Sequence, residues 1–260
     1  MSTFEIQKIG QQLHQALQSG EPLAPLTDSH PDMTLEQAYA VQLAMIQPRL
    51  DAGAKVIGKK IGVTSKVVMN MLKVDQPDFG HLLSDMLYSD GGVIEASSLI
   101  APKAEGEIAF LLKEDLQGPG VTVADVLRAT ASVMPCFEIV DSRIRDWKIQ
   151  IQDTVADNAS AAAFVLGDSA VDPRNVDLAC VGMTLEKNGE IVATGAGAAA
   201  LGHPANAVAW LANTLGKLGI GLKAGEVILS GSLAAMVPVQ AGDQLRISLG
   251  GIGSASVRFV

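Results

Sequence analysis

Residues 102–110 read Pro-Lys-Ala-Glu-Gly-Glu-Ile-Ala-Phe, an otherwise apolar stretch with two glutamates two positions apart. The pattern predicts a β-strand, in which residues i and i+2 point to the same face, so Glu105 and Glu107 would project side by side. Gly106 between them leaves the opposite face bare, which indicates that another part of the chain packs closely there. We therefore expect a strand that carries a carboxylate pair on one face and is tightly packed on the other.

A third glutamate, Glu138, lies in a second apolar run between Phe137 and Ile139. Buried carboxylates are costly unless a cation or a proton is shared among them. Three converging carboxylates suit a hard divalent cation such as Mg²⁺ or Mn²⁺, which prefers oxygen ligands in octahedral geometry. Three protein oxygens would leave about three positions for substrate and water in that geometry.

An alternating Glu-x-Glu is also typical of the solvated face of an edge strand, and the spacing alone favours that interpretation. The third glutamate and the apolar neighbours of all three glutamates favour a metal site. From the residues alone, the two interpretations are about equally good.

Composition excludes several classes of protein. With 260 residues, of which 48% are hydrophobic and 18% charged, the chain can bury a large core and is not globally disordered. A net charge of −9 without a basic run argues against binding to nucleic acid phosphates. An aromatic content of 4% leaves few platforms for stacking bases.

The two cysteines, Cys136 and Cys180, lie in apolar, strand-like segments without metal-ligand spacing, which predicts free buried thiols in a reducing compartment. The first residues lack a signal-peptide pattern, and no apolar run reaches the length of about 18 residues that a membrane span needs. We expect a cytoplasmic protein. A mean hydropathy of +0.28 suggests buried subunit interfaces and therefore a homo-oligomer.

The chain is helix-rich first and strand-rich later. Thr34-Leu35-Glu36-Gln37 reads as a capping box for a helix to about Leu50, which Pro48 is expected to bend or end early. The other elements expected before residue 142 are a helix at 3–18, strands at 56–63 and 133–141, helices at 64–72 and from Thr122, and a mixed segment at 78–87.

The second half is mostly β. Asn188-Gly189 predicts the turn of a hairpin over 184–192, Pro204 begins a helix, and strands are expected near 226–230, 243–250 and 254–260. This order predicts an α+β fold rather than alternating βαβ units. We expect one catalytic domain, 1–260, with an N-terminal helical layer at 1–55 and a β-rich core at 56–260.

Lys59 and Lys60 are adjacent in the predicted strand at 56–63, so they face opposite sides. One is expected to reach solvent and the other to enter the core, where the three glutamates could supply its negative partner. The alternative for Lys60 is an ordinary surface lysine on an edge strand.

Two other sequence patterns give little information about function. Gly195-Ala196-Gly197 starts a formal match to a dinucleotide fingerprint, but its predicted strand is antiparallel, so we expect a tightly packed turn instead. The four histidines show no ligand spacing, and only His81, in Asp78-Phe79-Gly80-His81, lies where polar groups could converge.

Six segments together resemble the hydratase/decarboxylase branch of the fumarylacetoacetate hydrolase superfamily, and the resemblance covers essentially the whole chain. These segments are 58–65 (Gly-Lys-Lys-Ile-Gly-Val-Thr-Ser), 76–80 (Gln-Pro-Asp-Phe-Gly), 104–110, 135–143, 155–160 (Val-Ala-Asp-Asn-Ala-Ser) and 186–189. Lys-Lys-Ile-Gly-Val-Thr-Ser and Glu-Gly-Glu follow the form found in the hydratases of this branch. The resemblance implies a mixed β-roll or sandwich of the fumarylacetoacetate hydrolase C-terminal type with an N-terminal helical layer.

The resemblance also implies roles for particular residues. It implies a divalent metal, Mg²⁺ or Mn²⁺, on Glu105, Glu107 and Glu138, proton transfer by Lys60, a water-orienting Asp78, and substrate-carboxylate contacts from Ser160 and Asn158. Arg143 is a weaker candidate for the carboxylate and is expected instead to be a structural partner of Asp141 or Asp146.

The implied reaction is hydration of a small 2-oxo/2-hydroxy dienoate, 2-hydroxypenta-2,4-dienoate, to 4-hydroxy-2-oxopentanoate in bacterial meta-cleavage of aromatic compounds. Two alternatives stay open. One is the sister activity, decarboxylation of 4-oxalocrotonate, and the other is a non-catalytic partner subunit of that decarboxylase. A complex with the decarboxylase is also implied as possible, whereas no nucleic acid or membrane partner is expected.

Overall fold

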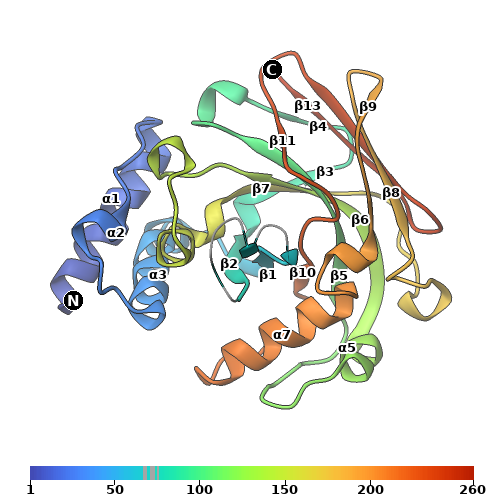
Figure 1. Ribbon diagram of the computed structural model, residues 1–260, viewed down its shortest axis with the longest axis horizontal. Helices are drawn as coiled ribbons and strands as arrows, with labels where there is room; N and C mark the ends of the chain where they lie inside the picture. Colours follow the sequence, from blue (N-terminus) through green and yellow to red (C-terminus); the bar gives the residue numbers. More distant parts are fainter. Residues whose placement is uncertain (67–68, 71–73, 75) are drawn as a thin grey trace.

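The computed structural model describes residues 1–66, 69, 70, 74 and 76–260 (Figure 1). It has an α+β fold with helices and two mixed sheets, as the sequence predicts. The short helix predicted for 64–72 falls largely on residues 67, 68 and 71–73, which lie outside the described residues.

Three helices form the N-terminal layer, at the left of Figure 1: α1 (Thr3–Ser19), α2 (Leu26–Ser29) and α3 (Leu35–Asp51). The predicted capping box opens α3, because Thr34 and Gln37 cap each other's backbone N–H groups. The expectation that Pro48 ends the helix early is wrong, because α3 continues to Asp51. Pro48 lacks the N–H that would bond to the carbonyl of Ala44, but its own carbonyl accepts from Ala52 N at 3.1 Å, so the last turn still closes.

The larger sheet runs in the order β2-β1-β10-β5-β6-β7-β3, with β11 paired to β5. Its strands are β1 (Val56–Gly62), β2 (Asp78–Leu83), β3 (Leu87–Ser89), β5 (Lys103–Leu112), β6 (Thr130–Val140), β7 (Ala161–Leu166), β10 (Val227–Leu229) and β11 (Val237–Pro238). The long pair of β5 and β6 lies at its centre, so residues on these strands are covered on both sides.

The second sheet runs in the order β4-β13-β12-β8-β9. Its strands are β4 (Gly92–Ile94), β8 (Gly182–Lys187), β9 (Glu190–Ala196), β12 (Gln244–Leu249) and β13 (Gly253–Phe259). The β8–β9 hairpin turns at Asn188 and Gly189, both at positive φ (56° and 86°), which confirms the predicted turn.

The shorter helices connect these strands. In the described part of the chain they are α5 (Val123–Ala129), α6 (Ile151–Ala156), α7 (Pro204–Gly216) and the 3₁₀ turns η1 (Ser84–Met86), η2 (Ala96–Ser98), η3 (Arg145–Trp147), η4 (Asn158–Ser160), η5 (Pro173–Asn175) and η6 (Gly197–Ala199). The cap by Thr122 and the start of α7 at Pro204 are as predicted.

Gly106 explains how the second sheet covers the first. A Cβ on this glycine would lie 2.4 Å from Sδ of Met183 on β8 and 3.1 Å from Cγ2 of Ile247 on β12. The close packing predicted behind the two glutamates is therefore present. The close packing predicted at Gly195 and Gly197 is also present, since a Cβ there would lie within 2 Å of the carbonyl oxygens of Leu233 and Leu178, respectively. Gly195 still belongs to strand β9, and the turn begins only at Gly197.

Candidate metal centre and active-site cavity

Strand pairing brings the three predicted glutamates together. Glu105 lies directly opposite Glu138 in the antiparallel β5–β6 register, and Glu107 follows Glu105 on the same face. One carboxylate oxygen from each residue lies within 4.8 Å of the other two. Glu107 and Glu138 are fully buried and Glu105 is partly exposed, so the cluster opens on the side of Glu105.

These carboxylates accept few hydrogen bonds for groups buried so deeply. Glu107 Oε2 accepts a 2.7 Å hydrogen bond from Gly231 N, but Glu107 Oε1 and both Glu138 oxygens accept none within the described residues. Burial raises the pKa of all three glutamates, and burial together with the charge of Glu138 raises that of Glu105 to about 8. Carboxylate oxygens at this spacing, three of which accept no hydrogen bond from the described residues, fit a divalent cation.

Lys60 supplies the cluster's positive neighbour. Its Nζ lies 3.2 Å from Glu138 Oε1 and donates a 3.0 Å hydrogen bond to the carbonyl of Ala159. Burial alone would lower the pKa of Lys60, but the facing carboxylates, Glu138 foremost, outweigh burial and raise it. Lys60 is therefore the core-facing lysine that the sequence predicts, with the negative partner expected for it.

The side chains of Asp78 and Lys60 both lie next to Gly62. The β1–β2 register places Asp78 opposite Gly62, and a Cβ on Gly62 would lie 2.3 Å from Asp78 Oδ1 and 3.0 Å from Lys60 Nζ. Asp78 Oδ1 is buried and accepts no hydrogen bond from the described part of the chain. A carboxylate and an ammonium thus face the same space, and the carboxylate has an oxygen free to accept a proton.

Lys59 does not reach solvent, so that expectation is wrong. Its side chain is only 6% exposed and its Nζ forms an ion pair with Glu226, 2.6 Å from Oε1 and 2.8 Å from Oε2. Glu226 precedes β10, the parallel neighbour of β1, and gives this lysine a carboxylate on the face opposite the cluster. Both lysines are buried because each has its own anionic partner.

A strained turn holds the segment that Lys60 contacts. Asn158, Ala159 and Ser160 all have positive φ, at 52°, 48° and 56°. Each such residue is disfavoured by roughly 1–2 kcal/mol, so surrounding contacts must enforce the turn. Ser160 lines the cavity described below, and its Oγ donates to Asp157 Oδ2 at 3.2 Å.

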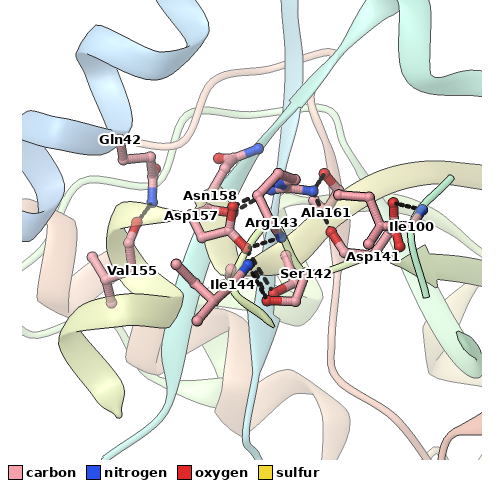
Figure 2. A network of polar contacts seen from close by, with 12 residues as sticks. Gln42, Ile100, Asp141, Ser142, Arg143, Ile144, Val155, Asp157, Asn158 and Ala161 are labelled. Carbon is pink, nitrogen blue, oxygen red and sulfur yellow. Dashed lines mark hydrogen bonds and ion pairs between the residues drawn. The ribbon is translucent and has the colours of Figure 1, made fainter. Parts of the chain in front are cut away.

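Those contacts centre on a buried ion pair between Arg143 and Asp157 (Figure 2). Arg143 Nε donates to Asp157 Oδ1 at 2.6 Å, and the two terminal nitrogens donate to the carbonyls of Asp141, Ala161 and Asp157. The structural role predicted for Arg143 is present, but its carboxylate partner is Asp157 rather than Asp141 or Asp146. The side chain of Asp141 instead accepts from Ile100 N and Ala101 N.

Asn158 links this turn to β2. Its Oδ1 accepts from His81 N at 2.7 Å and its Nδ2 donates to His81 O at 3.0 Å, so the amide is engaged with backbone. This geometry favours a positioning role over the predicted contact with a substrate carboxylate. His81 is buried and its Nδ1 lies 2.8 Å from Oε1 of Gln42, which comes from the helical layer.

A cavity of about 600 Å³ opens beside the cluster. Lys60, Asp78, Glu105 and Ser160 all line it, so four of the seven predicted site residues share one space with an apolar wall. Sequence reasoning missed Lys103 and Trp147 in this wall. Lys103 shares the face of Glu105 by its spacing, a signal that was available in the sequence, whereas Trp147 comes from a turn without any such periodicity.

The cysteines differ from their prediction in one respect. Neither forms a disulfide, and Cys136 is buried on β6 as expected. Cys180 is exposed because it lies in a turn rather than in a strand-like core segment.

Comparison with known proteins matches this chain to one family. The profile of the fumarylacetoacetate (FAA) hydrolase C-terminal region matches residues 61–260. A 2-hydroxyhexa-2,4-dienoate hydratase of Comamonas testosteroni is 59% identical over 98% of this chain and 97% of its own. A 2-hydroxypent-2,4-dienoate hydratase of Pseudomonas putida is 62% identical over 83% of this chain and 97% of its own.

Solved structures agree. The 4-oxalocrotonate decarboxylase of Pseudomonas putida G7, complexed with magnesium and adipate, superposes with a TM-score of 0.97 at 38% identity, over 100% of this chain and 99% of that one. Among the described residues, no helix is long and apolar enough to cross a membrane.

Proposed function

Since the chain belongs to the fumarylacetoacetate hydrolase family, we propose that it is a metal-dependent hydratase. The proposed reaction converts 2-hydroxypenta-2,4-dienoate (2-oxopent-4-enoate) to 4-hydroxy-2-oxopentanoate, as a step in meta-cleavage of aromatic compounds. The observation that carries the proposal is the cluster of three carboxylates, two of them fully buried, beside Lys60 and Asp78, in a chain 59% identical to a hydratase over nearly its full length.

We assign the metal to Glu105, Glu107 and Glu138, whose converging carboxylate oxygens suit Mg²⁺ or Mn²⁺. Bound there, the cation would supply Lewis acidity that polarises the C2 oxygen of the substrate and favours its enolate. We assign the contact with the substrate carboxylate to Ser160, and its position in the cavity wall supports this assignment.

The chain's own acid and base are Lys60 and Asp78. Hydration needs a proton delivered at C5 to form the conjugated 2-oxo-3-enoate, a water activated for addition at C4, and a proton returned at C3. The Lys60 ammonium lines the cavity and is held by Ala159 O, so it can deliver protons and balance the enolate charge. The unpaired Asp78 Oδ1 is the group able to orient or deprotonate the attacking water.

Decarboxylation of 4-oxalocrotonate is the second candidate. It is favoured by the near-complete superposition on the decarboxylase and by a lysine, Lys103, in the cavity wall, because such a substrate carries a second carboxylate. The intact carboxylate cluster and Lys60 argue against a non-catalytic partner subunit, which has no need for such costly buried charges.

Product identity tests the proposal. Purified protein, with and without Mg²⁺, is given freshly generated 2-hydroxypenta-2,4-dienoate and, separately, its C5-carboxylated analogue, and products are analysed by mass spectrometry. Metal-dependent gain of one water on the first compound, without CO₂ loss from the second, supports the hydratase. Loss of CO₂ from the second compound supports the decarboxylase, and inertness toward both contradicts the two activities alike.

Homo-oligomer formation, a complex with the decarboxylase, a single catalytic domain and a cytoplasmic location stay predictions. Exposed Ile191 and Val192 on the edge strand β9 support a subunit interface. Light scattering of the purified protein, alone and mixed with the decarboxylase, tests both assemblies.

A further inference from the structure

Gln42 joins the N-terminal helical layer to the segments beside the site. It lies on α3, outside the range that the family profile matches, and its side chain is fully buried. Its Nε2 donates to Phe79 O at 3.0 Å and to Val155 O at 2.6 Å, and Figure 2 shows the second of these contacts. The two carbonyls use both N–H groups of the amide, so Oε1, 2.8 Å from His81 Nδ1, accepts from that ring. One glutamine thus forms three hydrogen bonds to two other segments.

These two segments carry the residues to which we assign the acid–base chemistry. Phe79 directly follows Asp78, the proposed base, on β2. Val155 lies near the end of α6, which leads through η4 to Ala159, and the carbonyl of Ala159 accepts from Lys60 Nζ at 3.0 Å. The amide nitrogen therefore holds the backbone next to the proposed base and also the backbone that leads to the support of the proposed acid.

The segments β2 and η4 are also packed directly against each other. The Asn158 amide donates to His81 O at 3.0 Å and accepts from His81 N at 2.7 Å. A Cβ on Gly80 would lie 2.4 Å from Asn158 O, so the two backbones have no room to come closer. A contact that prevents them from moving apart therefore fixes their spacing. The amide of Gln42 makes such a contact, because its nitrogen bonds to one carbonyl on each side.

We propose that Gln42 is a positioning residue for hydration, which sets the spacing between β2 and η4 and thereby the distance between the Asp78 carboxylate and the Lys60 ammonium. Gln42 is not among the described residues that line the cavity, so it acts through these two groups rather than on the substrate. A displacement near 1 Å in placed groups can cost about 100-fold in rate. The helical layer is then part of the active site as well as a cover for the core. This inference rests on the proposed function in taking Asp78 as the base and Lys60 as the acid.

Steady-state kinetics with the dienoate and Mg²⁺ test the positioning role. Q42M replaces the amide with an apolar chain of similar size, and N213L does the same at Asn213, whose amide joins α7 to the backbone of Val121 by two 2.8 Å hydrogen bonds. Both variants should melt below the wild type. Q42M alone should lose kcat, by about ten- to a hundredfold, with KM within about twofold of the wild type. Q42N, whose amide is one methylene too short to reach both carbonyls, should lose kcat in the same way.

Hydrogen–deuterium exchange measured by mass spectrometry needs no turnover. In Q42M, peptides that cover 78–83 and 155–161 should exchange faster than in the wild type, whereas N213L should leave the exchange of these peptides unchanged. Wild-type kcat in folded Q42M or Q42N, or unchanged exchange in both segments, would overturn the positioning role. A kcat loss in N213L equal to that in Q42M would overturn it as well, since the loss would then follow stability alone. A wild type inert toward the dienoate, with faster exchange of both segments in Q42M, would keep the role of Gln42 in spacing the segments and reject the proposed function.

Discussion

Gly62 shows how one missing side chain determines the geometry of the site. Its backbone φ is not in the left-handed region, so alanine is conformationally allowed there, but its Cβ would collide with Asp78 Oδ1 and touch Lys60 Nζ. We expect G62A to fold and to lose about 100-fold in kcat, because displacements near 1 Å cost that much in placed catalytic groups. Steady-state kinetics and circular dichroism measure the two effects.

G182A is the matched control, since a Cβ at Gly182 meets nothing within 4 Å. It should keep wild-type kcat. A G62A enzyme with wild-type kcat would show that Asp78 and Lys60 do not act from the positions described above.

His81 makes stability depend on pH. Burial, followed by the charge of Lys59, lowers the pKa of His81 to about 4, and Gln42 uses its amide nitrogen on two backbone carbonyls, so His81 Nδ1 must donate to Gln42 Oε1. The unfolded chain, with a histidine pKa of about 6.5, binds this proton more readily than the folded protein. Stability from this group is therefore fully present above about pH 6.5 and is lost as the pH falls toward 4.

We expect the free energy of unfolding contributed by His81 to fall by about 2 kcal/mol between pH 7.5 and pH 5. Urea unfolding gives the free energy of unfolding of the wild type and of H81Q at each pH in that range. The loss due to His81 is the difference between the changes with pH of the two proteins. H30Q, at a histidine outside this network, should follow the wild type. Parallel curves for the wild type and H81Q would show that His81 is not held neutral by the fold.

At the scale of elements, the η4 turn depends on a fork of hydrogen bonds from Arg143. Lysine keeps the charge but cannot reach Asp157 and three carbonyls at once. We expect R143K to lose about 2–4 kcal/mol of unfolding free energy, because buried acceptors are left unpaired. We also expect a lower kcat, since the Ala159 carbonyl that holds Lys60 belongs to this turn.

Denaturant unfolding and kinetics on R143K measure the two losses together. R174K is the control, because Arg174 forms an exposed pair with Asp172 and its replacement should change neither quantity measurably. If R143K retained wild-type stability, the turn would be held by its own backbone rather than by the buried ion pair.

Elements differ in how far the sequence predicts them. Alternation is local, so β5, its carboxylate pair and the glycine behind it can be read from adjacent residues. The partners of buried charges cannot be read in this way, because they are far apart in the sequence. Lys59 pairs with Glu226, 167 positions away, and Arg143 pairs with Asp157, 14 positions away. The error at Pro48 has another cause: the local rule for proline predicts one lost backbone hydrogen bond but does not show whether the following turn still closes.

For the whole molecule, the metal centre is part of the core, because β5 and β6 lie in the middle of the larger sheet and under the second one. Without a cation, three carboxylates share one buried ammonium there. A cation that binds only the folded state should therefore stabilise the entire fold, by about 2.7 kcal/mol at 100 times its Kd. For a chain of this size that corresponds to a rise in Tm of roughly 5–10 °C.

Thermal unfolding after EDTA treatment, followed by titration with Mg²⁺ or Mn²⁺, measures this rise. E107Q should abolish it, and metal-free E107Q should melt above the metal-free wild type, because an amide at this buried position is neutral without a bound proton or cation. E186Q, on strand β8 of the second sheet, should respond to metal as the wild type does. An equal rise in Tm for E107Q and the wild type would place the stabilising cation elsewhere in the molecule. If E107Q also kept full turnover in metal-free buffer, the metal-enolate mechanism would have to be abandoned.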